Sequence, residues 1–367
     1  MDKRKALIAM SGGVDSSVAA ALMLEAGFDC IGVTMKLHGG GGTYSEKSCC
    51  TASDAEDARG VCARLGMKYY VFDFSADFEE RVIRRFTEAY ENGLTPNPCI
   101  DCNRFLKFDR LYRRAEELGC DFIVTGHYAR IDFDEKSGRW LLKKSLNAAK
   151  DQTYVLYSLT QEQLEHTRFP LGNFTGKEEV RALAHKLDLI NAAKRDSQDI
   201  CFVPDGDYAE FIRRYSGKDY PRGSFVDKSG NVLGEHKGII HYTIGQRKGL
   251  GLSFPEPMYV CEKNTADNTV ILAPEMELYS RTLIANDFNW ISREGAPEKP
   301  LRVWGKTRYS AREAPAYAEA SAGGVKITFD EPQRAVTAGQ AVVLYDGDAV
   351  VGGGTIIKTE NGGKTTW

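Results

Sequence analysis

The run Ser-Gly-Gly-Val-Asp-Ser-Ser at positions 11–17 constrains the fold more than any other part of the chain. It lies between a short apolar run, residues 6–10, and a helical pattern over 18–26. A buried strand that turns through glycines into a helix directs unpaired backbone N–H groups and the positive helix end to one point. The glycines allow close backbone approach, and the serine hydroxyls add donors for phosphate oxygens. The run predicts a phosphate-binding loop, although it lacks the Gly-Lys-Ser/Thr ending of a Walker-type loop.

The first 130 residues alternate between short β-rich runs and helical patterns. We expect strands over 29–35, 68–72 and 121–125, and helices over 53–65, 78–91 and 105–118. This βαβ alternation predicts an α/β fold with a mostly parallel sheet. Two residue pairs match the capping box that starts a helix, namely Ser53 with Glu56 and Thr175 with Glu178. Because ligands of an open parallel sheet bind beyond the carboxyl ends of its strands, we expect Ser11, Met35 and Gly126-His127 to converge on one crevice.

The pattern changes after about residue 205, where short alternating runs are separated by turn residues such as 227–230, 346–347 and 352–354. We expect a catalytic α/β domain over 1–205, a central β-rich domain over 206–278 and a C-terminal β-barrel over 279–367. A chain of 367 residues can bury two or three separate cores. Its formal net charge of −3 excludes a globally basic protein, so any RNA-binding surface must be a local basic patch.

The cysteines and the absence of long apolar stretches bear on the compartment. The chain has nine cysteines, an odd number, and the apolar run after Lys3–Lys5 is too short for an export signal. We expect a cytoplasmic protein with no membrane span, whose thiols serve chemistry, metal binding or core packing. Cysteines within apolar or periodic runs are expected in the core, and these are Cys30, Cys62, Cys120 and Cys261. The Cys49-Cys50 pair is assigned no role.

Two cysteine-containing segments carry the most specific signal, Thr-Pro-Asn-Pro-Cys-Ile-Asp-Cys-Asn-Arg-Phe-Leu-Lys at 95–107 and Arg-Asp-Ser-Gln-Asp-Ile-Cys-Phe at 195–202. Together with the loop, which resembles that of the N-type ATP pyrophosphatases, they resemble the tRNA-specific 2-thiouridylases of the MnmA family. The resemblance continues through 126–130, 150–152, 241–249 and 306–309. It implies an adenine nucleotide alpha hydrolase-like first domain. It also implies ATP-dependent exchange of the 2-oxygen of the wobble uridine for sulfur in tRNAs for lysine, glutamate and glutamine.

The same resemblance implies roles for individual residues. Cys201 would carry sulfur as a persulfide, and Cys102 would be the nucleophile that releases it, leaving a disulfide that a cellular reductant resets. A cysteine desulfurase or a sulfur-relay protein would supply the persulfide. ATP would contact Ala9, Met10, Ser11, Gly12, Gly13, Val14, Asp15, Ser16, Met35 and Gly126. The target base and the tRNA would contact Asn97, Pro98, Cys99, His127, Lys150, Asp151, Gln152, Arg308, Tyr309 and Gln340.

Local sequence adds independent expectations for the two thiols and for magnesium. The helical pattern starts after Asn103, which predicts Cys102 near a helix N-terminus, where a thiolate is favoured. Lys194 and Arg195 precede Cys201, and they would lower its pKa if they fold back towards it. Asp15 is the obvious carboxylate for Mg²⁺ beside the phosphates, or it caps the helix that begins there.

The expected strand around residue 304 places Arg302, Trp304, Lys306 and Arg308 on one face. This pattern suits an RNA backbone with a stacked base, and it equally suits the solvated outer face of a barrel strand. His127 is similarly open, since it is either a base contact or a hydrogen-bonded histidine at a strand end.

The proton-transfer residue, the sulfur-carrying group and the class of function remain open at this point. Cys99 stands where some family members have an aspartate proposed as acid/base, which leaves the proton-transfer residue open. Cys99, Cys102 and Cys201 could instead hold an iron–sulfur cluster, although three cysteines with one distant are weak metal-site evidence, so we favour the persulfide route. The loop also occurs in adenylating amide synthetases that use ammonia, and these are the second interpretation of the function. A non-catalytic RNA-binding module is the third.

Overall fold

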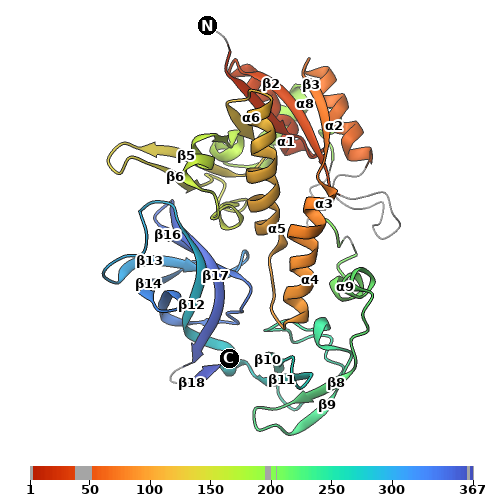
Figure 1. Ribbon diagram of the computed structural model, residues 1–367, viewed down its shortest axis with the longest axis vertical. Helices are drawn as coiled ribbons and strands as arrows, with labels where there is room; N and C mark the ends of the chain where they lie inside the picture. Colours follow the sequence, from red (N-terminus) through yellow and green to blue (C-terminus); the bar gives the residue numbers. More distant parts are fainter. Residues whose placement is uncertain (1–2, 38–51, 195–199, 204, 362–363, 367) are drawn as a thin grey trace.

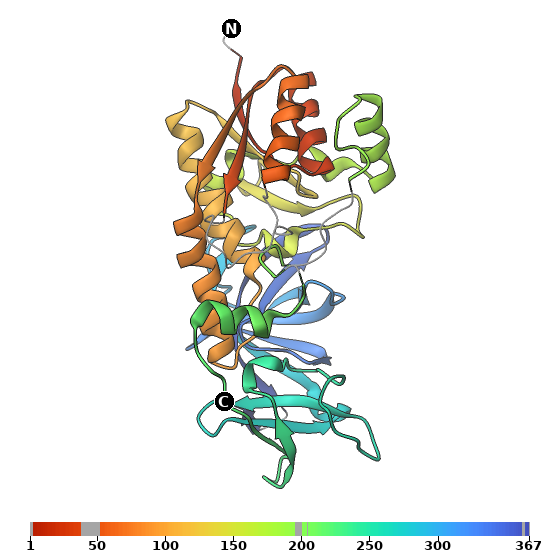
Figure 2. The same ribbon diagram turned by 90° about the vertical axis from the view of Figure 1, so that its right-hand side faces the viewer.

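The computed structural model describes residues 3–37, 52–194, 200–203, 205–361 and 364–366. A parallel sheet with its helices forms one end of the molecule, a small β sheet forms the other end, and a β-barrel lies beside the long helices between them (Figure 1). Figure 2 shows these parts stacked along the long axis. The expected fold class is confirmed. No helix among the described residues is both long and apolar enough to cross a membrane.

The first sheet has five strands in the order β3-β2-β1-β4-β7, and every neighbouring pair is parallel. The strands are β1 (Lys5–Ala9), β2 (Asp29–Lys36), β3 (Lys68–Asp73), β4 (Phe122–Val124) and β7 (Thr167–Arg168). The helices packed around it are α1 (Val14–Glu25), α2 (Ala52–Arg64) and α8 (Lys177–Lys186). Apolar side chains of β1 and α1 are completely buried against each other, which fixes the strand-to-helix turn between them.

Two long helical segments descend from this sheet (Figure 1). The first comprises α3 (Ser75–Phe78), the π-helix η1 (Glu79–Ile83) and α4 (Arg84–Glu91). The second comprises α5 (Pro98–Asp101), the π-helix η2 (Cys102–Arg110) and α6 (Leu111–Glu117). The second of these segments was expected to start near residue 105, whereas it starts at Pro98. Asn97 caps it by accepting the Cys99 N–H at 3.1 Å, Pro98 occupies the first helical position, and the π-helix interrupts the 3.6-residue period that the sequence pattern relied on.

Both predicted capping boxes are absent. The helix α2 begins at Ala52, so Ser53 lies inside it, and α8 begins after Gly176 without a side-chain cap. The Thr175 hydroxyl instead donates to the carboxylate of Glu179. A capping box does occur at α7 (Gln161–Glu165), where Thr160 and Gln163 satisfy each other's backbone N–H groups.

The first domain also supplies a hairpin, β5 (Ala129–Asp134) and β6 (Arg139–Lys144), which leaves the parallel sheet and extends the barrel sheet through the pair Lys143 and Ala349. Short 3-10 turns follow, namely η3 (Thr153–Val155) and η4 (Pro170–Asn173). This hairpin therefore joins the N-terminal region to the barrel sheet.

The central part contains α9 (Tyr208–Ser216), η5 (Ile239–His241) and a mixed sheet in the order β10-β11-β8-β9. Its strands are β8 (Gly223–Val226), β9 (Val232–His236), β10 (Met258–Asn264) and β11 (Thr269–Pro274), and η6 (Glu275–Leu278) leads out of it.

The barrel closes because β12 pairs with both β15 and β17. Its strands are β12 (Tyr279–Trp290), β13 (Leu301–Lys306), β14 (Ala314–Ser321), β15 (Gly324–Arg334), β16 (Ala341–Asp346) and β17 (Ala349–Asn361), with β18 (Lys364–Thr366) beside β17. The glycines 352–354 lie within β17 and do not form the expected turn. A Cβ on Gly353 would lie 2.7 Å from the Tyr157 ring, so the absence of a side chain permits close packing there.

Candidate active site

The loop at 11–17 is held by its own hydroxyl groups. The Ser11 N–H donates to Ser16 Oγ at 3.2 Å, and Ser16 Oγ donates to the Gly13 carbonyl at 3.0 Å. Gly12 has φ of +73°, and a Cβ there would lie 2.4 Å from the Asp54 carbonyl oxygen. Only glycine fits this position without displacing backbone. Gly13 is the N-cap residue of α1, so no side chain caps the first N–H groups of this helix. The first turn of α1 thus has the form expected of an anion site.

The other parts of the expected crevice lie at the same edge of the sheet. Thr34 Oγ1 donates to the Met10 carbonyl at 2.8 Å, which places the end of β2 and the buried Met35 beside the end of β1. A Cβ on Gly126 would lie 2.8 Å from Ser16 N, so the segment after β4 rests directly on the first turn of α1. The structure therefore brings the predicted nucleotide-binding segments together.

Asp15 faces two donors from distant segments. Its Oδ1 accepts the Tyr128 hydroxyl at 2.8 Å and lies 2.6 Å from Lys177 Nζ. The cap position of α1 is Gly13, so Asp15 does not cap the helix. Among the described residues no three His, Cys, Asp or Glu side chains are grouped to hold a metal. The carboxylate oxygen expected to face Mg²⁺ is thus engaged by a hydroxyl group and an ammonium group.

Sequence reasoning missed three residues that complete the loop, namely Tyr128, Lys177 and Asn191. Asn191 is 4% exposed, and its Nδ2 donates to the Gly12 carbonyl at 3.0 Å and to Ser17 Oγ at 2.9 Å. This amide anchors the Gly12 carbonyl from a segment far along the chain. Lys177 and Asn191 belong to no local motif, so no sequence signal pointed to them, whereas Tyr128 lies in the 126–130 segment that carries part of the resemblance.

The candidate reactive cysteines differ from expectation in their helix positions. Cys99 is exposed and lies in the first turn of α5, whereas Cys102 is only 9% exposed and follows that turn, at the start of η2. The helix dipole acts mainly within the first turn, so it favours a thiolate at Cys99 more than at Cys102. Cys102 thus lies further from the helix N-terminus than the sequence pattern placed it, because the helical segment already begins at Pro98.

Cys201 is half-buried, and the neighbouring Phe202 packs edge-on against Phe78 and Phe86, with ring centroids 5.7 and 5.2 Å apart. Lys194 does not fold towards Cys201, because its Nζ lies 2.6 Å from the carboxylates of both Asp54 and Asp57. Arg195 lies outside the described residues. The thiols of residues 99, 102 and 201 do not form a metal-ligand group in this structure.

The core interpretation of the other cysteines agrees with their burial. Cys30, Cys62 and Cys120 are buried, and Cys261 is half-buried. Burial raises the pKa of Cys30 to about 12 and the pKa of each of the other three to about 11. These thiols are protonated at neutral pH and poorly nucleophilic. Cys49 and Cys50 lie outside the described residues.

His127 is a hydrogen-bonded histidine in the core. It is 9% exposed, its Nδ1 lies 2.7 Å from Thr125 Oγ1, and its ring lies near Phe108 and Phe169. Burial and the nearby Lys107 hold its pKa well below the usual value, so the ring is neutral. This arrangement is the second of the two interpretations that the sequence left open.

The predicted tRNA contacts in the catalytic domain also have internal partners. The Asp151 carboxylate accepts the Ser145 N–H at 3.0 Å and the Thr153 hydroxyl at 2.6 Å, and burial raises its pKa. Gln152 Oε1 accepts the Tyr128 N–H at 2.8 Å. Pro98 is buried at the start of α5, and Lys150 is half-buried.

The predicted contacts in the barrel join it to the other two domains. Arg308 Nη2 donates to the Ile244 carbonyl at 3.0 Å and to Thr337 Oγ1 at 2.6 Å. Tyr309 donates to the Asp151 carbonyl at 3.3 Å, and Gln340 Nε2 donates to the Thr95 carbonyl at 2.8 Å. We call the contacts of Arg308, Tyr309 and Gln340 the barrel seam.

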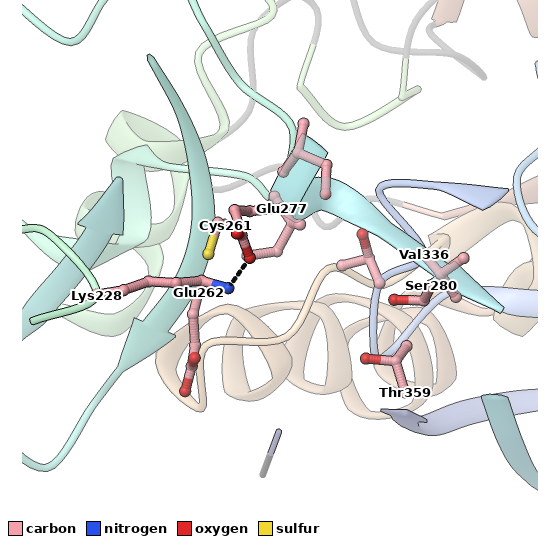
Figure 3. A pocket seen from close by; sticks show the side chains of 10 residues that line it. Lys228, Cys261, Glu262, Glu277, Ser280, Val336 and Thr359 are labelled. Atoms are coloured by element: carbon pink, nitrogen blue, oxygen red, sulfur yellow. Dashed lines mark hydrogen bonds and ion pairs between the residues drawn. The ribbon is translucent and has the colours of Figure 1, made fainter. Parts of the chain in front are cut away.

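The expected basic stripe is not continuous. Strand β13 ends at Lys306, so Arg308 lies beyond it. Arg302 and Trp304 are exposed, whereas Lys306 and Arg308 are half-buried. A small cavity lies between the central domain and the barrel, and Lys228 forms an ion pair with Glu277 at its wall (Figure 3). Its volume of about 40 Å³ holds water but no nucleotide.

The first domain combines a glycine-rich loop on a parallel sheet with a cysteine-bearing helix, and two β domains pack beside that helix. This combination defines a nucleotide-using enzyme of the HUP class. Residues 4–205 match the tRNA methyl transferase HUP domain, 209–274 match the tRNA methyl transferase PRC-barrel domain, and 280–356 match the Aminomethyltransferase beta-barrel domain.

Close relatives narrow this class to one family. The tRNA-specific 2-thiouridylase MnmA of Clostridioides difficile is 51% identical, with 97% of this chain and 99% of the relative covered. The MnmA of Acetivibrio thermocellus is 52% identical, with 97% and 100% covered. A solved 4-thiouridine synthetase–RNA complex with bound ATP is 18% identical over 57% of this chain and 50% of that one, with a TM-score of 0.39, too distant for any inference. The chain belongs to the MnmA family of tRNA-specific 2-thiouridylases.

Proposed function

We propose that this tRNA 2-thiouridylase adenylates the 2-oxygen of the wobble uridine at the 11–17 loop and then replaces that oxygen with sulfur carried on Cys201. The observation that carries the proposal is the convergence of the loop, Met35 and Gly126 at one edge of the sheet. The uridine oxygen would attack the α-phosphorus of ATP, and pyrophosphate would leave with the electron pair of the broken P–O bond. Adenylation turns a poor leaving group into AMP.

Sulfur transfer would follow on the two cysteines. The Cys102 thiolate attacks Sγ of the Cys201 persulfide, the S–S bond of the persulfide breaks, and the released sulfur takes the electron pair and adds to C2 of the uridine. AMP leaves with the former 2-oxygen, and a Cys102–Cys201 disulfide remains. A two-electron reductant restores both thiols. Both thiols must reach one uridine, and we infer that tRNA binding closes the segments that carry them onto the base.

The tRNA would be held by Asn97, Pro98 and Cys99 at the flipped base, by 150–152 at the anticodon arm, and by the barrel-seam residues. In the structure Tyr309 donates a hydrogen bond to the Asp151 carbonyl, which supports one shared surface for the barrel seam and the 150–152 segment. His127 would join them only if binding exposes it. We infer that tRNA exchanges some of these internal hydrogen bonds for its own. A cytoplasmic cysteine desulfurase or sulfur-relay protein would load Cys201.

The iron–sulfur route is a second candidate, favoured by the position of Cys99 three residues before Cys102 on the same helix. The three thiols do not fit a cluster in this conformation, so no step is assigned to one.

The test measures ATP-dependent transfer of labelled sulfur from a persulfide donor into unmodified glutamate tRNA, with metal-free protein and a chelator. Label at the wobble uridine establishes the persulfide route. Transfer that appears only after iron and sulfide are restored favours a cluster at Cys99, Cys102 and Cys201. Failure under both conditions, with ammonia incorporated instead, would point to the amide-forming class, and pyrophosphate release independent of tRNA would contradict the adenylation step.

A further inference from the structure

We propose that Cys99 is the resolving thiol of the sulfur-transfer cycle, which attacks Cys102 in the Cys102–Cys201 disulfide, forms a Cys99–Cys102 disulfide and returns Cys201 as a free thiol. The inference rests on the sulfur-transfer step proposed above. That step leaves Cys201 oxidised, so this residue cannot accept the next sulfur until its disulfide is broken.

The three cysteines differ in their access to solvent. Among the cysteines that the structure describes, Cys99 is the exposed one, whereas Cys102 is 9% exposed and Cys201 is half-buried. Because the rate of thiol–disulfide exchange depends on access, burial of Cys102 hinders attack by an external reductant on a Cys102–Cys201 disulfide. A disulfide that includes Cys99 would instead present a sulfur atom at the surface.

The backbone of the first helical turn brings residues 99 and 102 to one side. The Cys102 N–H is directed at the carbonyls of both Cys99 and Pro98, so this turn has partly the tighter 3-10 form, in which side chains three residues apart eclipse each other. Such Cβ atoms lie about 5–6 Å apart in a helix, and a disulfide needs about 3.5–4.5 Å. The first turn can absorb this difference, because its N–H groups have no partners within the helix.

The other described cysteines are less suited to this role. Burial raises the pKa of each of them to about 11 or 12, so they are protonated at neutral pH, and these are Cys30, Cys62, Cys120 and Cys261. None of the four lies on α5 or η2. Cys99 is therefore the described cysteine that combines exposure with a place one turn from Cys102.

The exchange balances without an added oxidant or reductant. Cys99 loses its proton to water, and its thiolate attacks Sγ of Cys102. As the new S–S bond forms, the bond to Cys201 breaks, its electron pair leaves on the Cys201 sulfur, and that sulfur takes a proton from water. An external dithiol then reduces the Cys99–Cys102 disulfide and is itself oxidised to a disulfide. A neighbouring thiol in the same turn acts at a high effective concentration, which favours this order of events.

The first experiment maps the disulfide that remains after one turnover. Full-length protein with a persulfide on Cys201, freed of donor, reacts with ATP and unmodified glutamate tRNA without reductant, and is then quenched with acid and N-ethylmaleimide. Mass spectrometry of the unreduced protein should find Cys99 joined to Cys102 and Cys201 alkylated. Cys99→Ser should instead leave Cys102 joined to Cys201, and Cys261→Ser should give the wild-type pattern. A wild type in which the Cys102–Cys201 disulfide predominates would overturn the proposal.

A second measurement separates the resolving role from contact with tRNA or proton transfer. After one turnover the tRNA is removed, and the return of the free Cys201 thiol is followed before and after a dithiol is added. The wild type should show free Cys201 before the dithiol is added. Cys99→Ser and Cys99→Asp should regain it only with the dithiol and about 10²-fold more slowly. Free Cys201 before dithiol in Cys99→Asp, which has an acid/base group but no thiol, would contradict the role.

Failure of the sulfur-transfer step can be told apart from failure of the resolving role. If the wild type transfers no sulfur to tRNA, the proposed function fails, and the protein alone is then equilibrated in glutathione redox buffers. Formation of a Cys99–Cys102 disulfide there supports the exchange between these two thiols. Its absence at every ratio of oxidised to reduced glutathione would overturn it.

Discussion

At the nucleotide loop, residues adjacent in sequence hold one another in place, as Ser11, Gly13 and Ser16 do through their own hydrogen bonds. At the barrel seam, Arg308 and Gln340 instead bond backbone carbonyls of other domains. The first region is held in shape before a ligand arrives, by these local bonds together with the Asn191 amide. The second is occupied by internal partners, so RNA binding there must replace existing bonds. The two halves of the reaction should therefore respond differently to mutation.

Cys201→Ser should separate thiolation from adenylation more than any other change. This change should abolish thiolation while tRNA-dependent pyrophosphate release stays near the wild-type rate, since the serine leaves the loop untouched and cannot carry a persulfide. Mass spectrometry of the tRNA and a pyrophosphate assay measure the two steps. Cys261→Ser, in the central domain, is the control and should thiolate normally. Retained thiolation in Cys201→Ser would show that another group carries the sulfur.

Gly12→Ala should instead impair the adenylation step at the 11–17 loop. The new Cβ would meet the Asp54 carbonyl at 2.4 Å in a backbone conformation with φ of +73°, so the loop must shift. We expect pyrophosphate release to fall about 10²-fold, because a displaced loop loses its donors to the transferring phosphate. Gly27→Ala, where φ is +87° and no atom lies within 4 Å, controls for backbone strain alone. Equal loss in both variants would mean that general destabilisation, not the loop, explains the effect.

A smaller effect is expected at the seam from Arg308→Met. It removes the guanidinium that bonds Ile244, Ala335 and Thr337, and it removes a cation available to RNA. We expect tRNA affinity to fall about tenfold, equivalent to about 1.4 kcal/mol, with ATP affinity unchanged. Filter binding over a range of salt concentrations measures it, and the exposed Arg312→Met is the control. Weakened ATP binding would contradict the independence of the two regions.

The same contrast explains what the sequence could reveal. The parallel sheet and the 11–17 loop were predictable, because each depends on a contiguous pattern of apolar residues and glycines. The start of the second long helix was not, because a π-helix breaks the period and Asn97 with Pro98 begins it earlier. Arg308 was placed on a strand that in fact ends at Lys306.

Lys177 and Asn191 show the other limit of sequence reasoning. Each reaches the loop from a segment more than 150 residues further along the chain, since the hydrogen bonds span 162 residues to Asp15 and 179 to Gly12. Neither belongs to a local motif, and one lysine at a helix start or one asparagine in a turn carries no signal of its own. Only the packing of α8 against α1 brings them to the site.

The smallest expected effect tests to which region His127 belongs. Its ring is neutral in the folded protein because burial lowers its pKa, whereas an unfolded histidine has a pKa of about 6.5. The unfolded state therefore binds the extra proton first as pH falls below about 6.5. The contribution to stability is complete above that value and declines below it, by at most about 1.4 kcal/mol per pH unit.

The measurement is the free energy of unfolding by urea from pH 5 to 8 for the wild type and His127→Asn, which cannot titrate in this range. We expect the difference between the two proteins to be constant above pH 7 and to shrink steadily below pH 6.5. A difference independent of pH would mean that His127 takes up its proton in the folded protein. The ring would then be accessible before RNA binds, and His127 would belong with the exchangeable contacts of the barrel seam rather than with the preformed edge of the sheet.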